Sequence, residues 1–379
     1  MNRYFLTGAS GAVGSAIVPL LVADPETTVR LLLRADSTEH LAQRFEALCE
    51  FWRLSPSDPA RARLQPLRGD ATLPAFGLGA DTYGELAADT THIIHCAASV
   101  RMNDALDKAR QSAVGSAQVI LALARRLATG GTLKKVEFVS TVGIAGKRPG
   151  ILPEQWIDEP RSFHNTYEQS KAEAEALVRA AIEDEALPIT VHRPSMVIGD
   201  SRDGRIIHYQ IFYYICEILS GRKTFGLYPD FGEVRLDVIA VDLVADAIVT
   251  ASGKADTAGR ILNLCSGPEQ SPTLRELRLL VRKDFRAHGK RTPIGLRIPH
   301  SWFAALPRLA AFFATPGKRT PLSTLPIYMD YLADSQGFCN AGYRAQLDAR
   351  GLTLPDPQVY LPAVIGHYLN KAGQRQPLP

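Results

Sequence analysis

Hydrophobic residues in the first 200 positions fall into short β-branched runs, and longer stretches with helical periodicity separate these runs. The runs predict six strands, at Tyr4–Leu6, Val29–Leu33, Leu64–Leu67, His92–His95, Val136–Val139 and Ile189–His192. The stretches between them predict helices at Ala12–Val22, Glu39–Phe51, Ala105–Leu127 and Tyr167–Glu183. Because these helices are long enough for right-handed crossovers, the pattern predicts an α/β fold with a doubly wound parallel sheet.

After His192 the pattern becomes mixed. It predicts helices at Ile206–Leu219 and Val241–Ala251, strands at Leu236–Ile239 and Ile261–Leu264, and two final helices at Asn340–Arg350 and Pro357–Asn370. We therefore expect residues 1–200 to form the sheet domain and residues 201–379 to form a smaller mixed α/β part. Residues 236–265 are expected to return to the sheet of the first part.

The 379 residues are 46% hydrophobic and 22% charged, which is typical of a soluble globular protein of one large or two fused domains. The chain opens on its first predicted strand, without the pattern of a leader peptide, and it has no run of about 18 apolar residues. Its five cysteines lie far apart without metal-ligand spacing, at Cys49, Cys96, Cys216, Cys265 and Cys339. We interpret them as reduced core residues of a cytoplasmic protein and expect no metal site.

The turn after the first strand, Thr7–Gly14, reads TGASGAVG and opens a helix. Glycines at this spacing are typical of a dinucleotide-binding turn, because they let the backbone approach a pyrophosphate at the amino end of the helix. The pattern predicts a Rossmann-type domain. We expect its turn to bind the cofactor through Gly8, Ser10, Gly11, Ala12, Val13 and Gly14.

The end of the second strand distinguishes NADH from NADPH. An acidic residue there would repel a 2′-phosphate, but the residue is Arg34, and Arg44 follows in the next helix. Two guanidinium groups would bind the phosphate by charge-assisted hydrogen bonds, which favours NADPH. Further cofactor contacts are expected after the third and fourth strands, at Asp70, Ala71, Ala97 and Ala98. Asp70 would accept a hydrogen bond from the adenine amino group.

Tyr167 and Lys171 lie one helical turn apart, just after the fifth strand. A nearby ammonium favours a phenolate, so we expect Lys171 to lower the pKa of Tyr167 towards neutrality and to make it a general acid. Lys171 would also hold the nicotinamide ribose. Thr141, at the end of the fifth strand, would donate to the same substrate oxygen. We prefer Thr141 to its neighbour Ser140 because it lies five residues before Gly146.

Four segments, TGASGAVG, VSTVGIAG, YEQSK and HRP, together resemble the extended short-chain dehydrogenase/reductase family over most of the chain. Four more are similar to its thioester-reductase and fatty-acyl-CoA-reductase branch: GDATLPAFGL, HCAASVRMN, RPSMVIGDSRDGR and RLDVIAVDLVADAI. The resemblance implies Thr141, Tyr167 and Lys171 as catalytic residues and Arg34 and Arg44 as phosphate contacts. It also implies that Pro194 and Val197 lie beside the nicotinamide.

The chain departs from the family pattern at three positions. Ser112 stands where the family has Asn, Asp203 replaces the usual Thr, and Cys339 falls where Asp is common. The first departure weakens the expectation of a proton relay at Ser112. None of the three alters the catalytic trio, so the resemblance implies activity but leaves the substrate open.

Three functions fit these residues. The favoured one is NADPH-dependent reduction of an acyl thioester, carried by coenzyme A or by a carrier protein, to an aldehyde or alcohol. The second is the same chemistry on a free ketone, sterol or nucleotide sugar, and the third is an NADPH-binding regulator or membrane-peripheral scaffold.

Residues 275–319 hold eleven Lys and Arg against two acidic residues. This basic region would meet coenzyme A phosphates, an acidic carrier protein or, through residues 297–319, an anionic membrane. No motif indicates nucleic-acid binding.

Overall fold

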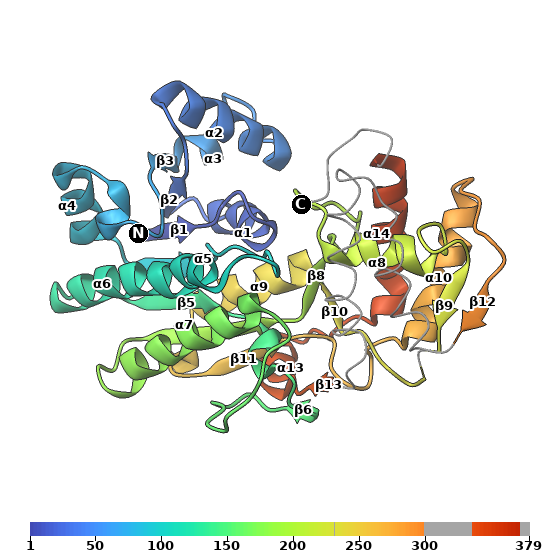
Figure 1. Ribbon diagram of the computed structural model, residues 1–379. Coiled ribbons are helices and arrows are strands. Elements are labelled where there is room, and N and C mark those ends of the chain that lie inside the picture. Colours follow the sequence, from blue (N-terminus) through green and yellow to red (C-terminus); the bar gives the residue numbers. More distant parts are fainter. Residues whose placement is uncertain (231, 299–335, 372–379) are drawn as a thin grey trace.

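The computed structural model describes residues 1–230, 232–298 and 336–371. Its centre is a sheet of seven parallel strands in the order β11-β7-β5-β4-β1-β2-β3 (Figure 1). The strands are β1 (Asn2–Thr7), β2 (Thr27–Leu33), β3 (Leu64–Arg68), β4 (His92–His95), β5 (Lys135–Val139), β7 (Ile189–Pro194) and β11 (Ile261–Leu264). The six expected strands are confirmed, and the Ile261–Leu264 strand adds the seventh.

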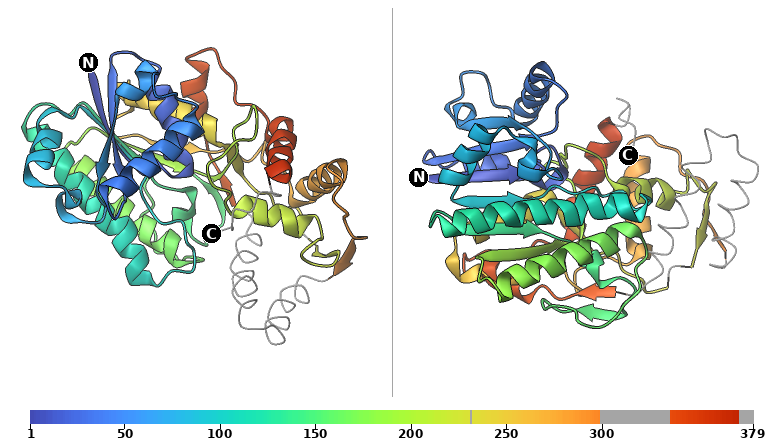
Figure 2. Two further views of the ribbon diagram at one scale, coloured as in Figure 1. Left: turned by 90° about the horizontal axis from the view of Figure 1, so that it is seen from above. Right: turned by 60° about the vertical axis from the view of Figure 1, so that its left-hand side comes forward.

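Helices cover both faces of this sheet, as the fold prediction required. On one face lie α1 (Ala12–Val22), α2 (Thr38–Trp52), α9 (Val241–Ser252) and α13 (Ala341–Asp348). On the other lie α4 (Ala80–Asp89), α5 (Leu106–Arg110), α6 (Ser116–Thr129) and α7 (Thr166–Glu183). Figure 2 shows α6 and α7 side by side along this second face. Short helices α3 (Pro59–Ala62), η1 (Pro74–Gly77), η3 (Val142–Ala145) and η4 (Ala255–Thr257) connect the larger elements.

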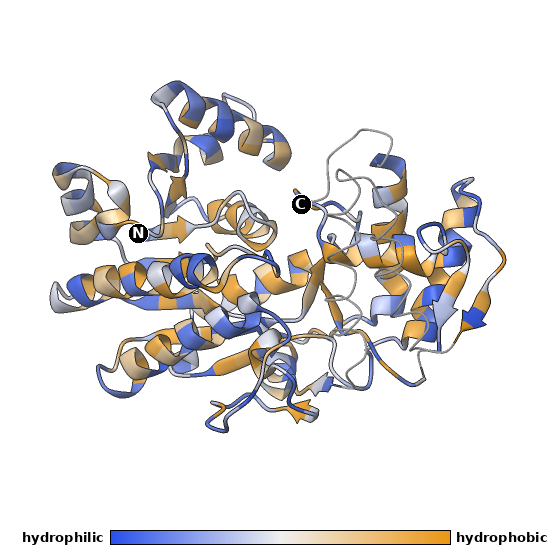
Figure 3. Cartoon of the chain, in the orientation of Figure 1, coloured by the Kyte–Doolittle hydropathy of each residue, from blue (hydrophilic) through white to orange (hydrophobic). Residues whose placement is uncertain are grey.

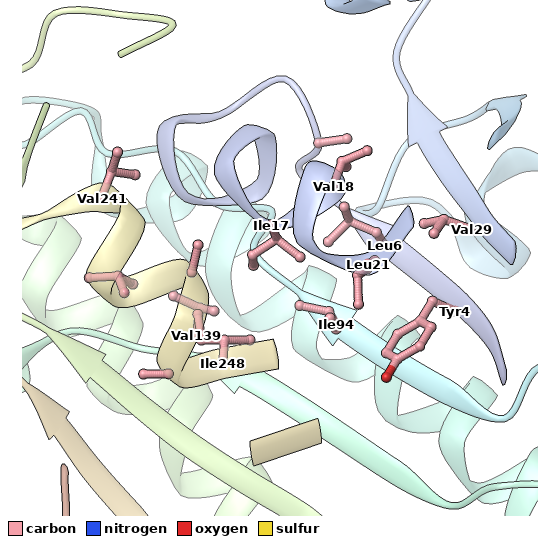
Figure 4. Close-up of a cluster of buried hydrophobic side chains, with 14 of the residues drawn as sticks. Tyr4, Leu6, Ile17, Val18, Leu21, Val29, Ile94, Val139, Val241 and Ile248 are labelled. Carbon is pink, nitrogen blue, oxygen red and sulfur yellow. The ribbon is translucent and has the colours of Figure 1, made fainter. Parts of the chain in front are cut away.

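Alternation along the strands divides the core in two. Phe5 packs towards α6, whereas its neighbours Tyr4 and Leu6 pack towards α1 and α9. Figure 4 shows this first cluster, in which Ile17 of α1 and Ile248 of α9 meet over the sheet. Figure 3 shows hydrophobic residues along the central strands, and helices that carry both hydrophobic and hydrophilic residues. Each such side chain stabilises the fold by about 1.5–3 kcal/mol.

Three small parallel sheets lie outside the central one. They pair β8 (Met196–Ile198) with β10 (Val238–Ala240), β9 (Leu227–Pro229) with β12 (Leu296–Ile298), and β6 (Gly150–Leu152) with β13 (Gln336–Phe338). Helices α8 (Ile211–Leu219), α10 (Leu274–Ala287) and α14 (Pro357–Lys371) share a further apolar core. None of the helices within the described ranges is long and apolar enough to cross a membrane.

Several expected elements differ from the structure. The single helix expected at Ala105–Leu127 is interrupted by a π-helical turn, η2 (Gln111–Gly115), so it forms α5 and α6. The aromatic helix begins at Ile211 rather than Ile206. The strand expected at Leu236–Ile239 is β10, which pairs with β8 outside the central sheet, whereas β11 joins that sheet beside β7. Residues 299–319 of the basic region lie outside the described residues.

Candidate active site

The strand order reverses between β1 and β4, because the chain proceeds from β1 towards β3 on one side and from β4 towards β11 on the other. At such a point the loops after the two strands diverge and leave a crevice at the carboxyl edge of the sheet. The glycine turn follows β1, and the Ala97–Ala98 loop follows β4. Residues 90 positions apart in sequence therefore meet, as the bond from the Ala97 amide to the Thr7 hydroxyl shows (3.3 Å).

The glycine turn is packed too tightly for side chains. Gly8 has a left-handed backbone (φ +80°), and a Cβ there would lie 2.8 Å from the Ala97 nitrogen. A Cβ on Gly14 would overlap the Gly8 carbonyl oxygen. Among the described residues no side chain caps α1, so the backbone amides of its first turn, from Ala12 onwards, remain available to an anion. The turn therefore fits a dinucleotide pyrophosphate.

Arg34 and Arg44 converge beside Ser10. Arg44 donates to the Ser10 hydroxyl (3.3 Å) and to the Arg34 carbonyl oxygen (2.6 Å). The Arg34 guanidinium pairs with Asp70, with Nε 2.8 Å from a carboxylate oxygen. Although burial raises the pKa of Asp70, its bonds from Thr72 and its pairing with Arg34 hold that pKa below its usual value. The Arg44 guanidinium thus lies beside the glycine turn and the Arg34 guanidinium beside Asp70, and such groups suit an anionic phosphate.

Helix α7 begins one residue before Tyr167 and presents it to the end of β5. Asn165 caps the helix, with its side-chain oxygen accepting the Glu168 amide (3.0 Å). The Thr141 hydroxyl lies close enough to the Tyr167 phenol to lower its pKa, and it accepts the Gly143 amide (3.1 Å). One turn further along, the Lys171 ammonium donates to the Val139 carbonyl oxygen (2.7 Å) and lies 5.0 Å from the centre of the Phe138 ring. The three expected residues are thus neighbours.

The expected acidity of Tyr167 is wrong for this structure. Burial raises the pKa of Tyr167 to about 12, and Thr141 offsets only part of that rise. The expectation placed the Lys171 ammonium against the phenol, but the ammonium donates to the Val139 carbonyl oxygen at the end of β5. Burial also lowers the pKa of Lys171 to about 8, a shift that Glu175 opposes. At neutral pH Tyr167 therefore keeps its proton and Lys171 its charge.

Sequence reasoning did not find a buried network behind Lys171. Glu175 accepts the Ser140 hydroxyl (2.5 Å) and forms an ion pair with Arg193, which is 0% exposed. Ser140 therefore faces away from Tyr167, which agrees with the preference for Thr141. The four-residue step from Lys171 to Glu175 was visible in the sequence, but its partner Arg193 comes from β7 and was not.

The remaining expected residues lie around the crevice. Pro194 ends β7 and Val197 lies in β8, at the carboxyl edge of the sheet. Ser112 lies in the π-helical turn, where its hydroxyl accepts the Ser99 amide (2.8 Å), so Ser112 supports the loop after β4. Within the part of the chain that the structure describes, no group of His, Cys, Asp or Glu side chains forms a metal site.

Comparison with known proteins agrees with this geometry. The model of an NAD-binding family described as "Male sterility protein" matches residues 6–248. An isonitrile lipopeptide synthase of Streptomyces coeruleorubidus is 28% identical over 271 residues, which are 70% of this chain and 18% of that protein. The aldehyde reductase lnaA of Aspergillus flavus is 28% identical over 277 residues, covering 69% and 25%. The chain spans a quarter or less of the length of these two relatives.

Solved structures show the same fold. The terminal R domain from the myxalamid PKS-NRPS biosynthetic pathway superposes with a TM-score of 0.80 at 24% identity, covering 100% of this chain and 93% of that one. The reductase domain of a nonribosomal peptide synthetase from Mycobacterium tuberculosis gives 0.70 at 21% identity, covering 98% and 92%. A thiolation-reductase di-domain from an archaeal non-ribosomal peptide synthetase gives 0.74 at 18% identity, covering 98% and 76%.

Proposed function

The chain belongs to the NAD-binding family described as male sterility protein, and from that membership we propose that it is an NADPH-dependent reductase of acyl thioesters. The observation that carries the proposal is the convergence of Thr141, Tyr167 and Lys171 at the carboxyl edge of β5, beside the glycine turn. A phenol, a hydroxyl and an ammonium at this place suit a carbonyl oxygen that gains negative charge.

The choice of NADPH rests on Arg34 and Arg44. The Arg44 guanidinium lies beside Ser10 and also binds the carbonyl oxygen of Arg34. Arg34 itself follows the end of β2, where an NADH-specific domain would carry an acid. Asp70, which the sequence assigned to the adenine, is held by Arg34 and Thr72 at the same edge. We assign the backbone of Gly8, Gly11 and Gly14, together with Val13, to the pyrophosphate, and Ala71, Ala97 and Ala98 to further cofactor contacts.

The chemistry then follows from the protonation states. Bound NADPH supplies a hydride to the carbonyl carbon. Tyr167 donates its phenolic proton to the carbonyl oxygen, and Thr141 donates a hydrogen bond to that oxygen. The hydroxyl of the resulting hemithioacetal returns its proton to the Tyr167 phenolate as the carbon–sulfur bond breaks, which releases an aldehyde and a thiolate. The thiolate takes a proton from water to give the free thiol. Lys171, whose ammonium donates to the Val139 carbonyl oxygen at the end of β5, would hold the nicotinamide ribose.

The thioester substrate is proposed from the relatives. Several of them are reductase domains of peptide synthetases, and one solved relative joins a thiolation domain to a reductase. We assign cofactor binding to residues 1–200 and binding of a coenzyme A or carrier-protein thioester to residues 201–379.

The test measures NADPH consumption, by near-ultraviolet absorbance, with acyl-CoA thioesters beside matched free ketones and aldehydes. Thioester-dependent consumption with release of one free thiol per aldehyde supports the proposal. Consumption with ketones alone would move the chain to the general dehydrogenases. Tyr167→Phe should bind NADPH normally and lose at least about 100-fold in turnover, because the proton donor is gone. The matched control is Tyr83→Phe, since Tyr83 lies on α4 away from the site.

A further inference from the structure

Three consecutive residues at the end of β5 each interact with one residue on a single face of α7. Val139 accepts a hydrogen bond from Lys171, Ser140 donates one to Glu175, and Thr141 lowers the pKa of Tyr167. Tyr167, Lys171 and Glu175 are spaced four residues apart, so they lie one above the other on the helix. Two of these contacts belong to the proposed active site, and the third belongs to Glu175, which has no role in the chemistry described so far.

Glu175 is held from three sides. Its side chain is buried, 5% exposed, and one carboxylate oxygen accepts the Ser140 hydroxyl at 2.5 Å. Arg193 approaches it with Nε at 3.1 and 3.2 Å and closes a second contact through Nη2. The remaining guanidinium nitrogen of Arg193 donates to the Gln155 carbonyl oxygen (2.9 Å). A carboxylate fixed by so many donors cannot rotate away from the helix face that it shares with Lys171.

A buried ion pair is an expensive way to hold a helix to a strand, because two charges must leave water. Apolar residues of the same size would pack as well at lower cost. The position of this pair is therefore informative: it lies directly beyond Lys171, whose buried ammonium has lost its own hydration. A fixed negative charge one turn away compensates for that loss.

The other ionisable groups around Lys171 do not supply this charge. From the end of β4, His95 is kept neutral because burial lowers its pKa to about 3, and Cys96 is kept neutral because burial raises its pKa to about 12. From α7 itself, Tyr167 stays protonated at neutral pH.

Two further charges act on the ion pair only through space, Arg161 on Glu175 and Glu154 on Arg193. Their hydrogen bonds go to backbone groups, from Arg161 to the Ile144 carbonyl oxygen (2.6 Å) and to Glu154 from the Asn263 amide (2.9 Å). Glu175 is therefore the one carboxylate, among the described residues, that acts directly on the Lys171 ammonium.

We propose that Glu175 is a positioning residue that keeps Lys171 charged and directed at the end of β5, with Ser140 and Arg193 fixing the carboxylate for this task. The inference rests on the proposed role of Lys171 and adds the residue that makes that role possible near neutral pH. On this proposal the ion pair between Glu175 and Arg193 affects the charge of Lys171, besides any contribution to stability.

The direct test follows the titration of Lys171 by NMR of the protein labelled with ¹³C at the lysine ε-carbons, with the Lys171 signal assigned from its loss in Lys171→Met. The wild-type midpoint is expected at about pH 8. Glu175→Gln removes the negative charge, keeps the side-chain volume and leaves Arg193 uncompensated. Both changes disfavour a second positive charge, so the midpoint should fall by about one pH unit or more.

The matched control is Glu173→Gln. Glu173 lies two residues away on the same helix, but it pairs with Arg110 at the surface. Its variant loses the same charge and should leave the midpoint unchanged. Ser140→Ala keeps both charges of the ion pair and should move the midpoint less than Glu175→Gln does. A midpoint in Glu175→Gln that moves no further than in Glu173→Gln would overturn the proposal and leave the pair with a purely structural role.

A second variant and a kinetic measurement keep the proposal testable if Glu175→Gln does not fold. If Glu175→Gln does not fold, the double variant Glu175→Gln/Arg193→Met removes the stranded guanidinium, and its Lys171 midpoint must still lie below that of the wild type. The alkaline limb of kcat/KM should move with the NMR midpoint. Absence of thioester turnover in the wild type would refute the proposed substrate, whereas the NMR titration decides the role of Glu175 without any substrate.

Discussion

Arg44→Ala should weaken NADPH binding more than Arg34→Ala, although Arg34 is the residue at the end of β2. A charge-assisted hydrogen bond contributes about 1.5–3 kcal/mol. Arg44 is half-buried, and no described carboxylate pairs with it, so its loss should cost that amount, roughly 10- to 150-fold in Kd. Arg34 is 64% exposed and already pairs with Asp70 at 2.8 Å. Giving up such a pair costs up to about 1 kcal/mol, and at that full cost roughly 2- to 30-fold remains for Arg34→Ala.

The assay is a fluorescence titration of each variant with NADPH and with NADH at fixed ionic strength. Neither substitution should change the affinity for NADH by more than about 2-fold, because NADH has no 2′-phosphate for the guanidinium groups to meet. Equal losses for the two cofactors would refute the assignment of the arginines to the phosphate. A larger loss from Arg34→Ala than from Arg44→Ala would refute the argument that Asp70 competes for Arg34.

Two other predictions concern the glycine turn and the pH profile of the reaction. Gly14→Ala should abolish NADPH binding and lower the melting temperature, since its Cβ would overlap the Gly8 carbonyl oxygen. The control is Gly84→Ala on α4, where a Cβ meets nothing within 4 Å, and it should stabilise the fold by about 0.5–1 kcal/mol. Normal NADPH affinity in Gly14→Ala would contradict the role of the glycine turn in binding the cofactor. The wild-type kcat/KM should stay constant below pH 7 and decline as the pH rises through about 8, because the pKa of Lys171 is lowered in the folded protein and its ammonium loses its charge there. A kcat/KM that stays constant up to pH 9 would exclude a requirement for the charged form of Lys171.

The sheet could be predicted because its signals are local. A parallel strand buried on both faces is a short apolar run, and each of the six expected runs lies in the sheet. Helix α4 was missed because Gly79 precedes it without a side-chain cap. Helix α10 was missed although Thr273 and Glu276 form a capping box, a signal that the sequence does contain. The π-helical turn between α5 and α6 has no such signal, since Ser112 forms its bond with Ser99 of a distant loop.

The site residues that could be predicted are those linked by a pattern within a single segment of the sequence. Tyr167 and Lys171 are linked by helical spacing, and Thr141 by its place at a strand end. What the ammonium of Lys171 contacts depends instead on where β5 passes beneath α7, which is a tertiary contact that the spacing does not encode.

The same limit hid Glu175. Its spacing from Lys171 is readable, but the sequence does not show that β7 lies beside β5 in the sheet and brings Arg193 to fix the carboxylate. Segment patterns thus predict which groups can react, whereas strand order decides which of them stay charged. The protonation of Lys171 is therefore the property of this site that most needs direct measurement.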